Sequence, residues 1–545
     1  MGINSVDERY KTLKAHGDHL FTKRQPLLSL WQEMADNFYV ERADFTVSRS
    51  LGYEFADHLM TSFPLMARRD LGNSFSAMLR RDQWFKLRAK QENREDSTPA
   101  KEWLEWATGV QYRAMYDRNS LFIKATKEGD HDYAAFGQCV ISVRLNRLQN
   151  GLLYRNWHLR DVVWCEDEEG KVNTIHRNWK PCCRDLARLF PKTVAQQVRD
   201  RLEKEPYHEV NCRHIVIPSD SYEGKWKTPY VSIYLDCEND TILEETGQWT
   251  KEYVIPRWQT VSGSQYAYSP ATVAALPDAR LIQMMTRVLL EAGEKATNPP
   301  MVAVQEAIRG DVAIYAGGIT WVDAQYDERL GEVLRPLSQD KTGIPTGLNM
   351  RDDIKMTIVD AFYLNKLNLP EIAGATAYEI SQRVQEYIRQ ALPIFAPMES
   401  DYNGALCEET FDLLMRNGAF GPADNIPDEI RGADVEFRFE SPLNAAIEKE
   451  KGQHFQEAAT LLASAMQIDP MVQVDLDVRE AFRDAVSGIG APAKWLRDEK
   501  EADAMLEEQK QVQQAQALAQ TISAGAGIAQ QVGEAEKSLN EASVA

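Results

Sequence analysis

Residues 269–300 read SPATVAALPDARLIQMMTRVLLEAGEKATNPP, and they open the region, ending at Gly418, that decides the fold. Pro270 can occupy the first turn of a helix, and Asn298-Pro299-Pro300 stops that helix. Between these points apolar side chains recur at three- and four-residue spacing: Ile282, Met285, Leu289, Ala292 and Ala296. This spacing predicts one long amphipathic helix.

A short, turn-rich insert from Met301 to Pro345 follows, with strand-like pieces at 301–304, 312–315 and 319–322. A second helix is predicted over Asn349 to Leu367, with one apolar side made by Ile354, Ile358, Ala361 and Phe362. Residues 369–374 then read LPEIAG. Because Pro370 lacks an amide donor and Gly374 weakens helix propagation, this stretch is expected to be a turn or hinge.

A third helix is predicted from Thr376, because Glu379 three residues later completes a capping box. Its apolar stripe continues past Pro393 and Pro397, through Ile380, Val384, Tyr387, Ala391, Phe395, Met398 and Tyr402. Each interior proline costs roughly 3 kcal/mol of helix stability, so the intact stripe predicts a kinked helix held by packing. Gly418 is expected to end it.

The chain before this region mixes helical and strand-like patterns. Amphipathic helices are predicted up to Phe63, with a new one starting near Ser50, and Pro99 can open another. Asn150-Gly151 separates two alternating runs and indicates a hairpin. Further strands and one helix are expected: strands 174–179, 209–217, 230–235 and 249–258, and helix 185–203. Residues 1–268 are interpreted as one α+β unit.

The chain after Gly418 is expected to hold one strand and several helices: strand 435–439 and helices 443–468 and 472–486. From Asp498 the composition shifts to Ala, Gln and Glu with a weak heptad, which suits either a ring of parallel helices or a frayed tail. The predicted class is α+β, predominantly helical.

The length and composition of the chain narrow the classes of protein to which it could belong. A chain of 545 residues is expected to form two to four structural units. Its net charge of −20 argues against gripping nucleic acid through a basic stripe, yet it suits a surface past which DNA slides. No run of 18 apolar residues predicts a membrane helix, and no apolar segment near Met1 predicts a secretory signal. Seven cysteines without such a signal predict reduced thiols.

The sequence lacks the motifs that are typical of nucleotide-binding and metal-binding sites. Gly170-Lys171 and Gly224-Lys225 lack the context of a phosphate-binding loop, so no nucleotide cofactor is expected. Histidines and cysteines gather between residues 158 and 214, but without C-x-x-C or helical H-x-x-x-H spacing they predict no metal site. Paired arginines at 68–69 and 80–81 are expected in intersubunit salt bridges. An enzyme such as a nuclease or peptidase stays an alternative.

At this point the chain resembles the portal proteins of tailed bacteriophages, specifically the head-to-tail connector family of short-tailed, podovirus-type phages. The likeness covers Arg9 to about Ala485. It is carried by the order of several stretches: 25–46 (QPLLSLWQEMADNFYVERADFT), 122–143 with Ala135-Phe136-Gly137, Tyr268-Ser269-Pro270, Leu276-Pro277-Asp278, Asn298-Pro299-Pro300 and 376–380 (TAYEI).

The resemblance implies a portal fold with wing, stem, clip and crown. Its parts would be the wing, 1–268; stem helix 1, 269–296; the β-rich clip, 297–347; stem helix 2, 348–367; the tunnel loop, 368–375; the long kinked helix and return to the wing, 376–440; the crown, 441–497; and a C-terminal helical barrel or flexible tail, 498–545.

The implied function is a dodecameric ring at a capsid vertex that forms the channel for DNA packaging and ejection. It would be no enzyme and would need no cofactor or metal. The channel is expected to be lined by Asp352, Asp353, Asp360, Asn368, Glu371 and Gly374, and the docking clip to present Ile314, Tyr315, Trp321, Asp323 and Tyr326.

The implied partners are double-stranded DNA read without sequence preference, the terminase large subunit, tail adaptor and nozzle proteins, and capsid and scaffolding proteins. No membrane partner is expected. The protein would be made in the host cytoplasm and located in the virion. A phage structural or scaffolding protein without a DNA channel is the alternative.

Overall fold

The structure, a computed structural model, describes most of the chain: residues 6–50, 52, 56–80, 83–91, 97–222, 226–303, 308, 312, 321–323, 334–336, 343–367, 396–439, 455–467 and 476–488, with single positions between 502 and 511. These residues group into two compact units. The larger holds residues 1–84, 110–420 and 439–443, and the smaller holds 85–109, 421–438 and 444–545.

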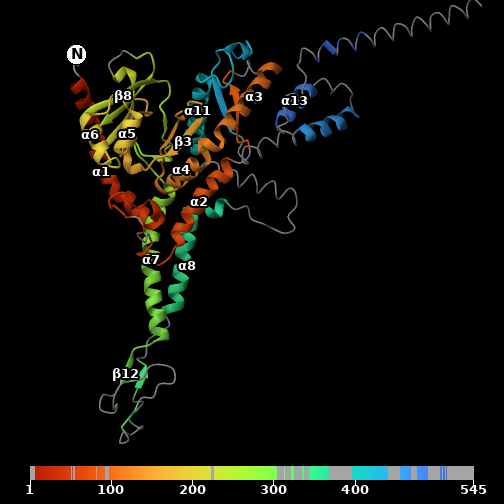
Figure 1. The fold of residues 1–545 in the computed structure, drawn as a ribbon. Helices are drawn as coiled ribbons and strands as arrows, with labels where there is room; N and C mark the ends of the chain where they lie inside the picture. Colours follow the sequence, from red (N-terminus) through yellow and green to blue (C-terminus); the bar gives the residue numbers. More distant parts are fainter. Residues whose placement is uncertain are drawn as a thin grey trace, which may run out of the picture. The chain divides into compact units, whose positions relative to one another are not determined.

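The larger unit begins with the long helix α1 (Val6–Phe38; Figure 1), and a short 3-10 helix, Val40–Arg42, follows it. The next helix, α2 (Phe63–Leu79), does not start near Ser50, so that prediction is wrong. Pro64 explains the later start, because proline lacks an amide donor and is favoured in the first turn of a helix. Helix α4 (Phe122–Phe136) packs against α2.

Two antiparallel sheets of three or more strands, beside two-stranded pairs, form the described β part of this unit. The larger has the order β4-β5-β6-β7-β8 and comprises Val162–Glu166, Val172–Trp179, Cys212–Pro218, Tyr230–Asp236 and Thr241–Gln248. The smaller has the order β3-β2-β9 and comprises Leu152–Asn156, Ile141–Leu145 and Tyr253–Val254. Strands β2 and β3 form the hairpin predicted at Asn150-Gly151.

The larger unit also departs from the sequence-based expectation in three further places. Strand β8 was not predicted, and only β9 and the pair β10–β11 (Gln259–Thr260, Ala267–Tyr268) form near the strand expected at 249–258. The helix expected at 185–203 is two helices, α5 (Cys183–Leu189) and α6 (Gln196–Lys204). Pro191 between them cannot donate the amide hydrogen bond that a continuous helix needs.

The main core lies where α1 meets the sheets. Trp31 of α1 packs with Phe136, at the end of α4, and belongs to one buried cluster with Trp164 of β4 and Val216 of β6. Farther toward the N-terminus of α1, Tyr10 belongs to a second cluster, on the other face of the large sheet, with Ile215 and Ile233. Helix α1 therefore contributes apolar side chains to clusters on both faces of the sheet.

Within residues 269–300, the predicted long helix is α7 (Pro270–Thr297), with Ser269 as its N-cap. The Ser269 hydroxyl accepts a hydrogen bond from the Thr272 amide. A short ribbon of β12 (Met301–Ala303) and β13 (Leu334–Pro336) follows α7. Helix α8 (Gly343–Ala361) starts before the predicted Asn349.

The second predicted helix does not continue unbroken to Leu367. It stops at Tyr363, which adopts a positive φ of 59°, and a short helix α9 (Leu364–Leu367) follows. A positive φ is rare for a side chain as bulky as tyrosine and cannot be part of a right-handed helix. The chain therefore changes direction just after the buried residue Phe362.

The described end of the third predicted helix starts at residue 396. A π-helical segment, Met398–Gly404, follows Pro397 and leads into α11 (Ala405–Arg416). Met398 and Tyr402 of the predicted stripe are fully buried, as heavy packing requires. Gly418 has a positive φ of 73° and follows the end of the helix, which confirms the predicted stop.

The smaller unit contains β1 (Phe85–Ala89) paired with the predicted strand β14 (Val435–Phe439). The Lys90 amide donates to the Asp434 carbonyl at 2.9 Å, just beyond this pair. Helix α3 (Thr98–Met115) begins in this unit, and α13 (Val478–Gly488) belongs to it. Residues 85–109 thus group with a distant part of the chain rather than with the rest of residues 1–268.

The structure also describes helical residues 455–466 and five short 3-10 helices: Val40–Arg42, Arg118–Ser120, Leu159–Asp161, Ser219–Ser221 and Ala423–Asn425.

Candidate functional site

Helices α7 and α8 pack side by side and run toward the β12–β13 ribbon (Figure 1). The N-terminal part of α7 is buried up to Ile282, within the larger unit. Beyond it the predicted apolar face is half-buried, and the neighbouring face exposes Met284 at 68% and Val288 at 63%. On α8, Met350 and Met356 are also exposed. Several large apolar side chains on one helix pair indicate an interaction surface.

The start of α7 is fixed by two of the stretches that carry the resemblance. The Ser269 and Thr272 hydroxyls donate to the carbonyls of Ala134 and Ala135 at 2.7 and 2.8 Å. Gly137 has a φ of 73°, and a Cβ there would lie 2.1 Å from the Tyr268 carbonyl carbon. Only glycine fits this close approach, so the end of α4 positions the start of α7.

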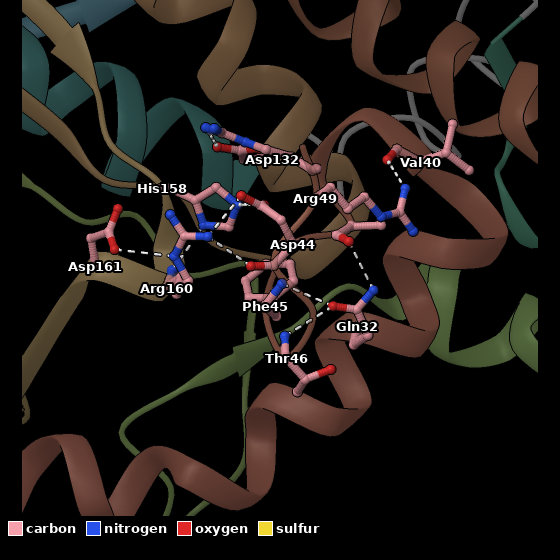
Figure 2. Close-up of polar contacts among 12 residues, drawn as sticks. Gln32, Val40, Asp44, Phe45, Thr46, Arg49, Asp132, His158, Arg160 and Asp161 are labelled. Atoms are coloured by element: carbon pink, nitrogen blue, oxygen red, sulfur yellow. Dashed lines mark hydrogen bonds and ion pairs between the residues drawn. The ribbon is translucent and has the colours of Figure 1, made fainter. Parts of the chain in front are cut away.

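The stretch after α1, which also carries the resemblance, is held by polar contacts (Figure 2). The Gln32 side-chain oxygen accepts from the amides of Phe45 and Thr46 at 2.9 and 3.0 Å. Asp44 contacts His158 at 2.5 Å and accepts from Arg160 at 2.7 Å. These contacts fix the loop to β4 and to the core, so they are structural.

The three acidic residues predicted for the channel all lie exposed on α8. Asp352 accepts hydrogen bonds from Arg351 at 2.9 Å and Lys355 at 3.3 Å, and these two cations, Arg351 foremost, lower its pKa. Asp352 is therefore paired within its own helix. Asp360 accepts from the Asn365 amide at 2.6 Å. Asp353 and Asp360 are seven residues apart and share one face of α8.

The remaining predicted site residues are only partly described. Trp321 of the predicted docking clip is 72% exposed, and Val322 beside it bridges to Ile308. Asp323 follows in the same short piece. The other predicted positions lie outside the described residues: Ile314, Tyr315, Tyr326, Asn368, Glu371 and Gly374.

Two of the paired arginines, Arg68 and Arg80, have partners inside the chain rather than standing free for the intersubunit salt bridges expected from the sequence, whereas Arg69 is exposed and Arg81 lies outside the described residues. Arg80 is buried against Asp130 of the same chain, at 2.9 Å. Arg68 is also buried, and it donates to the Phe38 carbonyl at 3.0 Å and contacts His131. These arginines bind inside the chain because the fold brings α2, α4 and the end of α1 together, a proximity that one sequence does not reveal.

The histidines between residues 158 and 214 have partners inside the fold. His176 contacts His16 at 3.1 Å, and His214 contacts Tyr253 at 2.5 Å and Ser232 at 2.8 Å. Within the described part of the chain, no three histidine, cysteine or acidic side chains are placed to hold a metal ion. The described helices likewise include none with the length and apolar character needed to cross a membrane.

Comparison with known proteins identifies the family. Residues 10–496 match the family described as bacteriophage head to tail connecting protein. The chain is 25% identical over 453 residues to a probable portal protein of Bordetella phage BPP-1, covering 80% of this chain and 79% of that protein. It is 22% identical over 460 residues to the portal protein of Salmonella phage epsilon15, covering 82% and 80%.

Solved structures of gene transfer agent particles also match. A chain from the native virion has 8% identity and a TM-score of 0.37, covering 78% of this chain and 94% of that one. A chain from the native neck has 9% identity and a TM-score of 0.36, covering 73% and 86%. The family match spans most of the chain, including α7 and α8. The chain therefore belongs to the bacteriophage head to tail connecting proteins, and it is a portal-type connector located in the virion at the capsid vertex.

Proposed function

We propose that copies of this chain assemble into a dodecameric ring whose channel admits DNA during packaging and ejection. The observation that carries the proposal is the set of exposed apolar side chains on α7 and α8, headed by Met284 and Val288. A solitary molecule would leave this surface in water, whereas copies packed side by side would bury it. Residues 269–296 and 348–367 would then be the stem helices.

The other parts follow the order implied by the family. Residues 1–268 and 376–440 would form the wing, 297–347 the clip, 368–375 the tunnel loop, 441–497 the crown, and 498–545 a helical barrel or tail. The face of α8 with Asp353 and Asp360 would line the channel together with Asn368, Glu371 and Gly374. Carboxylates there would repel phosphate and keep the duplex mobile rather than bound. Asp352 would contribute little, because Arg351 and Lys355 pair with it.

The clip would dock the terminase large subunit during packaging and tail adaptor and nozzle proteins afterwards, while capsid and scaffolding proteins would contact the wing. Exposed Trp321 suits such a role, because a large aromatic side chain is a frequent anchor of protein interfaces. Ile314, Tyr315, Asp323 and Tyr326 would extend that surface. The chain itself would do no catalysis, and ATP hydrolysis would belong to the terminase.

Native mass spectrometry of the purified chain tests the ring. Twelve copies of the 61.9 kDa chain give a particle of about 740 kDa, and electron micrographs should show annular particles. Monomers or trimers at every protein and salt concentration would overturn the ring and favour a structural protein without a channel. ATP turnover by the isolated rings would contradict the non-enzymatic role.

A further inference from the structure

The two edges of the five-stranded sheet differ in charge and shape. The edge strand β4 joins β5 through a turn that begins with Glu166-Asp167-Glu168-Glu169, the only run of four consecutive acidic residues in the sequence. At the other edge, β7 and β8 line a cavity of about 440 Å³. Because β6 lies between β5 and β7, the turn and the cavity lie at different edges of the sheet.

The cavity wall carries a guanidinium without a bonding partner. Arg144 of β2 lines the cavity and makes no hydrogen bond or ion pair within the described part of the chain. Arg416 of α11 lines it as well and lies over the ring of half-exposed Trp249, with the guanidinium carbon 4.0 Å from the ring centroid. The cavity thus offers the unpaired guanidinium of Arg144 and the guanidinium of Arg416, which is held against the Trp249 ring.

The acidic groups at the cavity leave the Arg144 guanidinium available to pair with a carboxylate from another chain. Glu252, 5% exposed, lines the cavity, and the guanidiniums of Arg144 and Arg177 both act on its carboxylate. Arg177 behind it is 3% exposed, and its Nη1 has no hydrogen-bond partner. Glu252 therefore offsets one of two guanidiniums. Glu244 and Arg416 also line the cavity, so the charges of Arg144, Arg177, Arg416, Glu244 and Glu252 sum to one positive charge.

Other charged groups lie beside this cavity without lining it. Glu408, Glu409 and Asp412 project from α11, and Glu409 accepts a hydrogen bond from the Lys251 amide at 3.3 Å. The Lys251 ammonium and the exposed guanidinium of Arg155, on which Arg177 and Arg144 act, supply two further cations nearby. The wider surroundings are close to neutral, so specificity would come from the unpaired Arg144 rather than from bulk charge.

The acidic turn is rigid and presents one free carboxylate. Asp167 accepts hydrogen bonds from the amides of Glu169 and Lys171 at 3.0 and 2.8 Å, and Arg257 donates to Glu166. Glu169 pairs with Lys171 at 2.7 Å. Glu168 is exposed and has no hydrogen bond or ion pair among the described residues. A preorganised turn loses little conformational entropy on docking.

We propose that the turn Glu166–Glu169 of one copy docks at the cavity of the next copy, with the Glu168 carboxylate paired to Arg144. This inference rests on the proposed ring. A ring uses head-to-tail contacts, in which two different surfaces of each copy meet. A free carboxylate at one edge of the five-stranded sheet and a free guanidinium in the cavity beside its other edge supply such a pair, and a second copy necessarily carries both.

Charge reversal tests this pair. Because every copy carries both residues, R144E alone or E168R alone places like charges at every interface, and R144E/E168R restores an opposite pair at each one. R147E is the matched control, since Arg147 is exposed in the same β2–β3 hairpin and does not line the cavity. Native mass spectrometry over a protein dilution series gives the concentration at half-assembly, and circular dichroism checks folding.

The two single variants should need at least about tenfold more protein for half-assembly, while R147E and the double variant should assemble like the original chain. Singles that assemble normally, or a double variant as weak as the singles, would overturn the pairing. A defect in R144E without one in E168R would also overturn it, because the cavity would then hold another partner. If the unaltered chain forms no rings, the ring proposal fails instead.

Discussion

Arg80 and Asp130 form a buried ion pair in which the Nη1 atom of Arg80 donates to both carboxylate oxygens of Asp130 at 2.9 Å. The Arg80 Nε also donates to the side-chain oxygen of Asn403 at 2.8 Å, and the guanidinium lies over the Tyr402 ring. Arg80 follows α2, Asp130 belongs to α4, and Asn403 belongs to the π-helical segment. One guanidinium therefore joins three elements that are far apart in sequence.

Replacing Asp130 by asparagine should be strongly destabilising. D130N keeps the shape of the side chain but leaves the Arg80 charge buried without a counter-ion, which costs about 3–5 kcal/mol. Urea unfolding measures the change. D70N is the control, because the Arg69–Asp70 pair is half-exposed and should contribute less than about 1 kcal/mol. Equal losses in the two variants would show that Arg80 finds another partner or water.

Gly137 and Gly170 both have a left-handed backbone, but only Gly137 is crowded by other atoms. Replacing each by alanine therefore distinguishes the cost of steric crowding from the cost of backbone strain. A Cβ at Gly137 would lie within 2.3 Å of backbone atoms of Tyr268 and Ser269, whereas Gly170 has nothing within 4 Å. G170A should cost about 1 kcal/mol for its positive φ alone. G137A should cost at least about 3 kcal/mol or abolish folding, because backbone must move. Soluble yield and urea midpoints measure both, and similar values would refute the close packing of α4 on the start of α7.

Glu409 should make the unfolding free energy depend on pH. Burial raises the pKa of Glu409 to about 7 from its ordinary value of 4.5, although the Lys251 amide opposes this rise. Because the pKa of Glu409 is raised in the folded state, the contribution of Glu409 to the free energy of unfolding is full below pH 4.5. This contribution is lost as the pH rises through 7. E409Q should therefore leave stability unchanged at pH 4.5 and raise it at pH 8 by up to about 3 kcal/mol.

Urea unfolding of E409Q at several pH values between 4.5 and 8 provides the measurement. E203Q is the control, because Glu203 is exposed on α6 and its replacement should shift stability by less than about 0.5 kcal/mol at any pH. A parallel pH profile for E409Q and the original chain would show that Glu409 ionises freely in the folded state.

Local signals explain which elements the sequence predicted well. The start of α7 is set by Ser269 and Pro270, and the β2–β3 hairpin by Asn150-Gly151, so neighbouring residues alone decide these features. The apolar faces of α7 and α8 followed from helical spacing, and Ile282, Ile354 and Ile358 are indeed buried.

Contacts between distant residues explain what the sequence did not reveal. Strand β1 is defined by its pairing with β14 near the other end of the chain, and the pairing of Arg80 with Asp130 requires α2 and α4 to be packed first. The exposed face of α7 with Met284 and Val288 was missed for a related reason. Helical spacing predicts the face with Ile282 as the buried one, but it does not distinguish apolar residues beside that face that stay exposed in a single chain.

Introducing charge on that exposed face of α7 should separate assembly from folding. Met284 and Val288 are four residues apart and therefore lie on the same side of the helix. M284E/V288E should leave the unfolding free energy of the single chain within about 0.5 kcal/mol, because both side chains are already in water. It should nevertheless prevent rings, because buried carboxylates between stem helices would repel one another without counter-ions.

V261E is the control, since Val261 is equally apolar and 55% exposed but lies in the turn between β10 and β11. Native mass spectrometry of the three proteins decides the matter: rings formed by M284E/V288E as readily as by V261E would place the subunit contact elsewhere, whereas small species from M284E/V288E alone would locate it on α7.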